Sequence, residues 1–151
     1  MVVFQGILMQ LFLKVLLRLP APLIAGTLWF LSSQTTLPQP PGPLGWDKLQ
    51  HLLAYGVLAF AIGLWMMPAF WKNRIILAML LTTLIGAAYG AIDEIHQYFI
   101  PGRHSNVWDW VANVLGSFLG ALAIMCIMRK YSQTVDNTNA MARQEKVNKI
   151  T

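Results

Sequence analysis

The chain has 151 residues, of which 56% are hydrophobic and 11% charged, and its formal net charge is +5. This composition, with a mean hydropathy of +0.53, is typical of an integral membrane protein and leaves room for one domain. The basic residues lie in short clusters beside apolar runs rather than along one polar face, which excludes a nucleic-acid partner. The single cysteine, Cys126, excludes an intramolecular disulfide and a cysteine-based zinc site.

Four stretches are long and apolar enough to cross a bilayer, which takes about 20 residues of helix. They cover residues 15–33, 49–67, 75–97 and 110–128. We therefore predict an all-α integral membrane bundle with four transmembrane spans.

The two ends of the chain differ from these spans. Residues 1–14 are expected to form an amphipathic segment on the membrane surface. A cleaved signal peptide is the alternative there, but the apolar run continues through Trp29 and Leu31 without a small-residue cleavage site. Residues 132–151 are polar and are predicted to be a disordered cytoplasmic tail. The membrane domain then covers residues 15–131.

The basic residues predict an orientation. They precede the first span, lie between the second and third, and follow the fourth, whereas only Lys48 and Arg103 lie on the other side. By the positive-inside rule both termini are cytoplasmic, as in a multi-pass protein of the bacterial inner (plasma) membrane. The proline-rich loop 34–46 then lies outside in an extended conformation, as does the loop 99–108, where Pro101 and Gly102 predict a turn.

Polar residues gather at the outer ends of three predicted spans. The second begins with Asp47, Lys48 and His51, the third ends with Asp93, Glu94, His96 and Gln97, and the fourth begins with Asp109 and Asn113; His104 lies in the loop between the last two. Ionisable residues at membrane depth are costly and are by default candidates for a functional site. We therefore expect an outward-facing polar pocket between spans two, three and four.

Helical spacing predicts how these residues share faces. Intervals of three and four positions unite Gly86, Gly90, Asp93 and Gln97 on one helix, and Asp109, Asn113, Gly116 and Gly120 on the next. Because the two helices are antiparallel, the glycines are expected to face each other deep in the membrane, through two GxxxG motifs that allow close approach.

A third polar face comes from the second span. Asp47, His51 and Tyr55 recur at intervals of four and complete the pocket. Adjacent helical residues point about 100° apart. If Asp93 faces the fourth span, Glu94 faces the second.

Three stretches of this region, "DKLQHLLAY", "DEIHQYFIPGR" and "DWVANVLG", resemble the VanZ-like family in residue type, order and spacing, over residues 47–120. The resemblance implies a small multispan membrane protein. It also implies an antibiotic-resistance role in the cell envelope, since the member that names the family is linked to resistance to teicoplanin, a glycopeptide that targets cell-wall precursors. It implies no particular reaction.

The leading hypothesis is a binding pocket for a cell-envelope precursor or an amphiphilic drug, with membrane lipid, a lipid-linked precursor or a glycopeptide as partner. Its expected ligand-binding residues are Asp47, Lys48, His51, Tyr55, Asp93, Glu94, Gln97, Arg103, Asp109 and Asn113. Lys48 and Arg103 would contact an anionic head group.

Two alternatives stay open. An intramembrane hydrolase or transferase acting on a lipid-linked substrate would use Glu94 or Asp93 as general base, with His51 or His96 as its partner. A zinc or manganese form of that site would use Asp47, His51, Glu94 and His96, although no HExxH motif is present. The other alternative is a network that only locks the helices together. The sequence identifies no cofactor.

Overall fold

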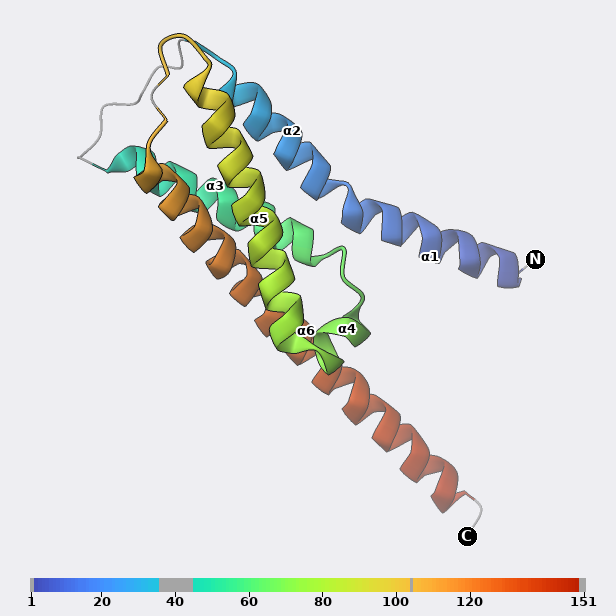
Figure 1. Ribbon diagram of the computed structural model, residues 1–151. Coiled ribbons are helices and arrows are strands. Elements are labelled where there is room, and N and C mark those ends of the chain that lie inside the picture. The colour runs from blue at the N-terminus through green and yellow to red at the C-terminus, as the bar shows by residue number, and fades with distance from the viewer. Residues whose placement is uncertain (1, 36–44, 104, 150–151) are drawn as a thin grey trace.

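A computed structural model describes residues 2–35, 45–103 and 105–149, which form six α-helices and no strand (Figure 1). The helices are α1 (Val2–Arg18), α2 (Pro20–Ser32), α3 (Trp46–Gly63), α4 (Pro68–Asn73), α5 (Ile75–Tyr98) and α6 (Val107–Asn148). The all-α prediction is confirmed. Most of the proline-rich loop and His104 lie outside the described residues.

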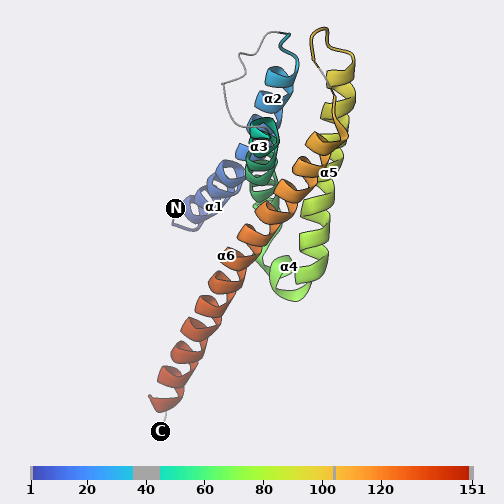
Figure 2. The ribbon, with the colours of Figure 1, turned by 90° about the vertical axis from the view of Figure 1, so that its left-hand side faces the viewer.

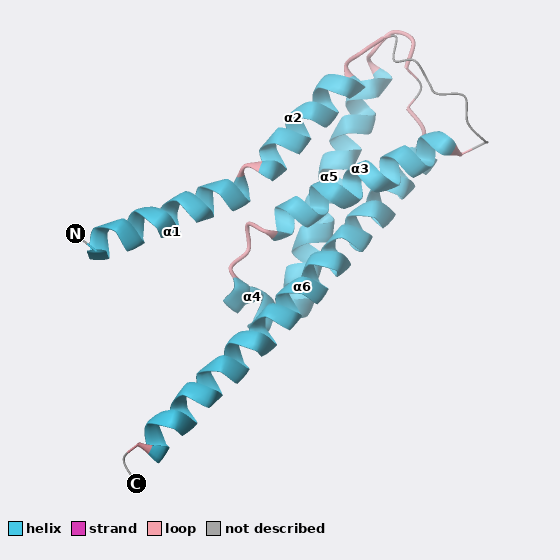
Figure 3. Cartoon of the chain, turned by 180° about the vertical axis from the view of Figure 1, so that it is seen from behind, coloured by secondary structure: helices cyan, strands magenta, loops and turns pink. Residues whose placement is uncertain are grey.

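Helix α3 lies at the centre of the bundle, where it contacts α2, α5 and α6. The end of α2, the start of α3 and the connection between α5 and α6 gather at one end, which we call the loop end (Figures 1 and 3). The two termini point toward the opposite end. A view along another direction shows that α6 continues well beyond the other helices there (Figure 2).

Within the described residues, three segments are long and apolar enough to cross a membrane: Phe12–Ser32, which joins the end of α1 to α2, then α5, and α6. The prediction of four spans is therefore wrong. Helix α3 falls short because its first two turns carry Asp47, Lys48 and His51, and because the helix already ends at Gly63. Because α3 packs between α5 and α6, these two helices shield its polar turns, and the turns do not need an apolar sequence.

The outer surfaces of the bundle suit a hydrocarbon environment. Large apolar side chains lie exposed along α5 and α6, among them Ile76, Leu80, Leu84, Phe118 and Ile127. Water would not favour such a surface, whereas lipid chains would. The structure and the sequence thus agree on a multi-pass membrane protein.

The helices at both ends of the chain extend beyond the predicted boundaries. The first helix runs on to Arg18 without a break at residue 14, and Pro20 then begins α2 at the position where proline fits a helix. Helix α6 continues to Asn148 where disorder is predicted. Local polar contacts support this extension, because Thr138 bonds the carbonyl of Thr134 and Lys72 of α4 pairs with Asp136 at 2.7 Å.

The closest helix crossing joins α6 to α3. A Cβ atom added at Gly116 or Gly120 would come within 3.0 Å of backbone atoms, the carbonyl oxygens of Leu52 and Gly56 included. Glycine is therefore required for this approach of two backbones.

The glycines of α5 have different neighbours. A Cβ added at Gly86 would meet the side chain of Ser117, and one at Gly90 would meet that of Asn113. The prediction that the glycines of the two helices face each other is wrong. Residues 116 and 117 point about 100° apart, so one face of α6 contacts α3 while the next contacts α5.

Candidate functional site

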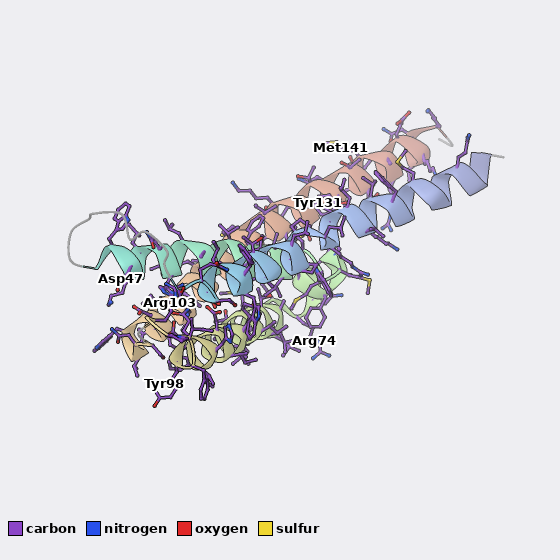
Figure 4. All side chains as sticks on the ribbon, turned by 90° about the horizontal axis from the view of Figure 1, so that it is seen from above. Asp47, Arg74, Tyr98, Arg103, Tyr131 and Met141 are labelled. Carbon is purple, nitrogen blue, oxygen red and sulfur yellow. The ribbon has the colours of Figure 1, made fainter. Side chains whose placement is uncertain are left out.

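A polar cavity of about 180 Å³ opens at the loop end between α2, α3 and α5. It is lined by Leu28, Leu31, Ser32, Asp47, Gln50, His51, Ala54, Tyr55, Asp93, Gln97 and Arg103. Figure 4, which looks down on the molecule, labels Asp47 and Arg103 close together at this end. The wall formed by α2 was not foreseen, because the sequence predicts the pocket between the other three spans.

A tight turn positions Arg103. Its backbone N–H bonds the carbonyl of Ile100 at 3.1 Å, and Gly102 has a φ of 81°, a left-handed conformation that suits glycine. The predicted Pro101–Gly102 turn is thus confirmed. The guanidinium donates to the carbonyl of Leu31 at 3.1 Å and to that of Ser32 at 3.4 Å. It therefore caps the last turn of α2 and closes the cavity on that side.

Asp93 and Tyr55 supply buried polar groups without protein partners. Gln97 donates to one oxygen of Asp93 at 3.1 Å, but the other oxygen has no hydrogen-bond partner among the described residues. The hydroxyl of Tyr55, whose side chain is also buried, lies beside Asp93 but forms no hydrogen bond of good geometry with any described residue. Such atoms are uncommon in native structures and mark a place where a ligand or water completes the bonding.

A second cluster lies behind His51, where α3, α5 and α6 meet. The Nδ1 atom of His51 is 3.0 Å from Oδ1 of Asn113 and 3.8 Å from Oε1 of Glu94. The other oxygen of Glu94 accepts hydrogen bonds from the hydroxyl of Ser105 and the backbone N–H of Asn106, both at 3.3 Å. His51 thus belongs to both the cavity wall and this cluster.

Lys48 joins the cluster from its outer side. Its ammonium is 2.7 Å from Asp47 and 3.1 Å from Asp109. The hydrogen bond from Lys48 holds the pKa of Asp47 below its ordinary value, and these two carboxylates raise the pKa of Lys48. Asp47 therefore keeps its negative charge and Lys48 its positive charge near neutral pH.

His96 lies apart from these groups. Its ring stacks on Trp29 with centroids 4.0 Å apart, and its Nε2 atom is 2.9 Å from the hydroxyl of Ser33. Two positions beyond Glu94, it points to the opposite side of α5, toward α2. The predicted metal set of Asp47, His51, Glu94 and His96 therefore does not come together in the structure.

A larger apolar cavity of about 460 Å³ follows the polar one along the same groove, away from the loop end. Its lining also comes from α2, α3 and α5, together with the turn after α3: Ala21, Pro22, Ala25, Leu58, Ile62, Trp65, Met66, Ile85 and Tyr89. Tyr55 of the polar cavity and Tyr89 of the apolar one have ring centroids 6.2 Å apart. The hydroxyl of Tyr89 also bonds the carbonyl of Ala25 at 2.6 Å, which ties α5 to α2.

The sequence of the chain matches one known protein family. The family described as VanZ/LLP1 matches residues 4–129. The chain belongs to the VanZ/LLP1 family. No curated protein and no solved structure is significantly similar to it.

The VanZ/LLP1 match extends beyond the motifs between residues 47 and 120, from α1 into α6. It therefore includes α2, whose residues wall the polar cavity, and every residue of the two cavities and of the cluster behind His51. The family assignment expected from the motifs is confirmed.

Sequence reasoning missed several residues of this VanZ/LLP1 site. Asn106 has a recognisable signal, because asparagine before an apolar run favours a helix N-cap, and its side chain does accept the N–H of Trp108 at 3.0 Å. Ser105, Gln50 and Tyr89 carry no local signal. Their roles depend on which helix lies opposite.

Proposed function

We propose that this VanZ/LLP1 protein binds an amphiphile, with the polar head group in the polar cavity and the hydrocarbon chain in the apolar cavity. The observation that carries the proposal is the order of the two cavities, which follow each other between the same three helices. A lipid-linked molecule has that order of polarity from head to chain.

The cavity walls favour a small head group with both donors and acceptors. Tyr55 and Gln50 offer polar side chains, and the free oxygen of Asp93 accepts a hydrogen bond from a hydroxyl or amide of the ligand. A volume of about 180 Å³ accommodates a phosphate or one sugar. A whole glycopeptide is much larger, so a drug such as teicoplanin would enter only with part of its structure.

The family and the charge distribution support a cellular setting for this proposal. The loop end faces outward, both termini face the cytoplasm, and the protein lies in a bacterial plasma membrane. The ligand is then an envelope precursor or an amphiphilic drug in the outer leaflet. Reduced sensitivity to teicoplanin is the phenotype that this function would produce.

A filled-cavity variant tests the proposal. Ile62→Phe places a bulky side chain in the apolar cavity, whereas Val57→Phe adds the same ring on the exposed side of the same helix. Purified protein is mixed with dodecyl glucoside, whose sugar hydroxyls match the walls of the polar cavity, and examined by native mass spectrometry. We expect the parent and Val57→Phe to retain the probe and Ile62→Phe to lose it. Equal retention by all three proteins would contradict the proposal.

A second candidate function is hydrolysis of a lipid-linked substrate. The close approach of His51 and the buried Glu94, at 3.8 Å, favours it, because such a pair can act as a general base. Ser105 bonds Glu94 rather than His51, so these residues do not form a nucleophilic triad. Water would be the nucleophile. Release of inorganic phosphate from dodecyl phosphate by the parent but not by Glu94→Gln would favour this candidate.

A further inference from the structure

Buried negative charge exceeds buried positive charge at the loop end. Asp93, Glu94 and Asp109 are 3%, 6% and 7% exposed. Among the described lysines and arginines, only Lys48 lies within ion-pair distance of any of them, and it pairs with Asp109 while also pairing with the more exposed Asp47. His51 beside Glu94 adds a positive charge only when it is protonated, so with a neutral imidazole the site favours a further positive charge.

Three donor groups converge at this place from three different helices. His51 of α3, Glu94 of α5 and Asp109 of α6 each offer one ligand atom, and these atoms all lie within 4.8 Å of one another. The Oδ1 atom of Asn113 is 3.0 Å from Nδ1 of His51 and lies on the same side. Donors bound to one ion at about 2.0–2.2 Å lie about 3.0–3.5 Å apart, so small side-chain rotations close the remaining distance.

Glu94 is already oriented for such a role. Ser105 and Asn106 hold its Oε2 atom by two hydrogen bonds, while Oε1 is buried, faces His51 and has no hydrogen-bond partner in the described part of the chain. Outer hydrogen bonds of this kind fix the carboxylates that bind metal ions. The free Oε1 is an observation separate from the clustering of the three residues.

We propose that a divalent cation, Mn²⁺ or Zn²⁺, binds between His51 Nδ1, Glu94 Oε1 and a carboxylate oxygen of Asp109, with Asn113 Oδ1 as a fourth ligand. One imidazole nitrogen with carboxylate and amide oxygens suits these ions better than Ca²⁺ or Mg²⁺, which prefer oxygen ligands alone. The ion would neutralise the excess negative charge. Because His51 also lines the polar cavity, the ion would stand at the cavity wall.

Metal content and stability test the site directly. The full chain is purified with a chelator, dialysed against Mn²⁺ or Zn²⁺ and analysed for bound metal and melting temperature. We expect one ion per chain and a higher melting temperature. Glu94→Gln and Asp109→Asn should each weaken binding by at least about tenfold. Asp93→Asn is the matched control, since it removes an equally buried carboxylate from the same helix and should keep the ion.

A spectroscopic readout separates coordination from a general loss of structure. Mn²⁺ bound through an imidazole gives nitrogen modulation in pulsed electron paramagnetic resonance, and this signal should disappear in His51→Gln while Asp93→Asn retains it. Failure of the parent to bind either ion stoichiometrically would overturn the proposal. So would equal loss of metal in Asp93→Asn and Glu94→Gln. A third contradictory result would be a melting temperature of metal-free Glu94→Gln that equals that of the metal-loaded parent. Glutamine resembles protonated Glu94, so a proton rather than a metal ion would then supply the missing neutralisation.

Discussion

The crossing of α6 over α3 gives a quantitative prediction for Gly120. A Cβ at this position would come within 3.0 Å of the carbonyl of Gly56, whose atoms belong to a helical backbone and cannot rotate away. Gly120→Ala must therefore push the two helices apart, and overpacking of this kind costs about 1–3 kcal/mol. Alanine also favours the helix by about 1 kcal/mol relative to glycine, which offsets part of that cost.

A control variant removes the helix-propensity contribution. Gly26 of α2 has nothing within 4 Å of an added Cβ, so Gly26→Ala gains the propensity without the clash. The difference in unfolding free energy between the two variants is then about 1–3 kcal/mol, which corresponds to about 3–10 °C in melting temperature for a chain of this size. Scanning fluorimetry in detergent measures both. Equal melting temperatures would show that α3 and α6 do not cross at Gly120.

Three further predictions concern other contacts of the bundle. Asp93→Asn, which keeps the shape but removes the charge, should weaken retention of dodecyl glucoside, whose hydroxyls can donate to Asp93, without lowering the melting temperature; full retention by this variant would leave a structural network instead. Cysteines at positions Gly86 and Ser117, in a Cys126→Ala background, should form a disulfide on mild oxidation, because an added Cβ at Gly86 lies 3.0 Å from that of Ser117 and a small separation of the helices reaches the range of about 3.5–4.5 Å in disulfides. Arg103→Gln should loosen the last turn of α2, seen as faster amide hydrogen exchange there, since the bonds to two terminal carbonyls are lost.

The sequence predicts the helices well where the apolar signal is continuous. The predicted third span, 75–97, agrees with α5 within one residue at its end, because no charge interrupts the run before Asp93. Length and hydropathy alone do not decide α3, whose polar turns are compensated by neighbours that lie far away in the sequence. The same limit applies to α6, where spacing shows that Gly116 and Gly120 share a face but does not identify the helix that this face meets.

The site could be predicted only in part, because the spacing of residues along a helix does not identify the helix that lies opposite. Position along the helix places Asp93, Glu94 and His51 at one depth, and rotation about the helix separates Asp93 from Glu94. The predicted direction of Asp93 is wrong, however: Asp93 faces the cavity beside α2 and α3, whereas Glu94 lies where α3 and α6 meet. The sequence also groups His96 with them, because it indicates how deep a residue lies in the membrane but not toward which helix its side chain points. The wall formed by α2 depends on tertiary contacts of Trp29 and Tyr89, which no local pattern reveals.

The central position of α3 has a consequence for biogenesis. This helix leaves the ribosome before α5 and α6, yet these two helices supply most of its packing. With a polar first half, α3 is a poor substrate for stepwise release into lipid by the translocon. It must wait at the edge of the insertion channel, or at the bilayer surface, until α6 is synthesised and the glycine crossing can form. Helix α3, which falls short of a membrane span by itself, thus makes membrane integration a cooperative event that is completed only after the final span has emerged.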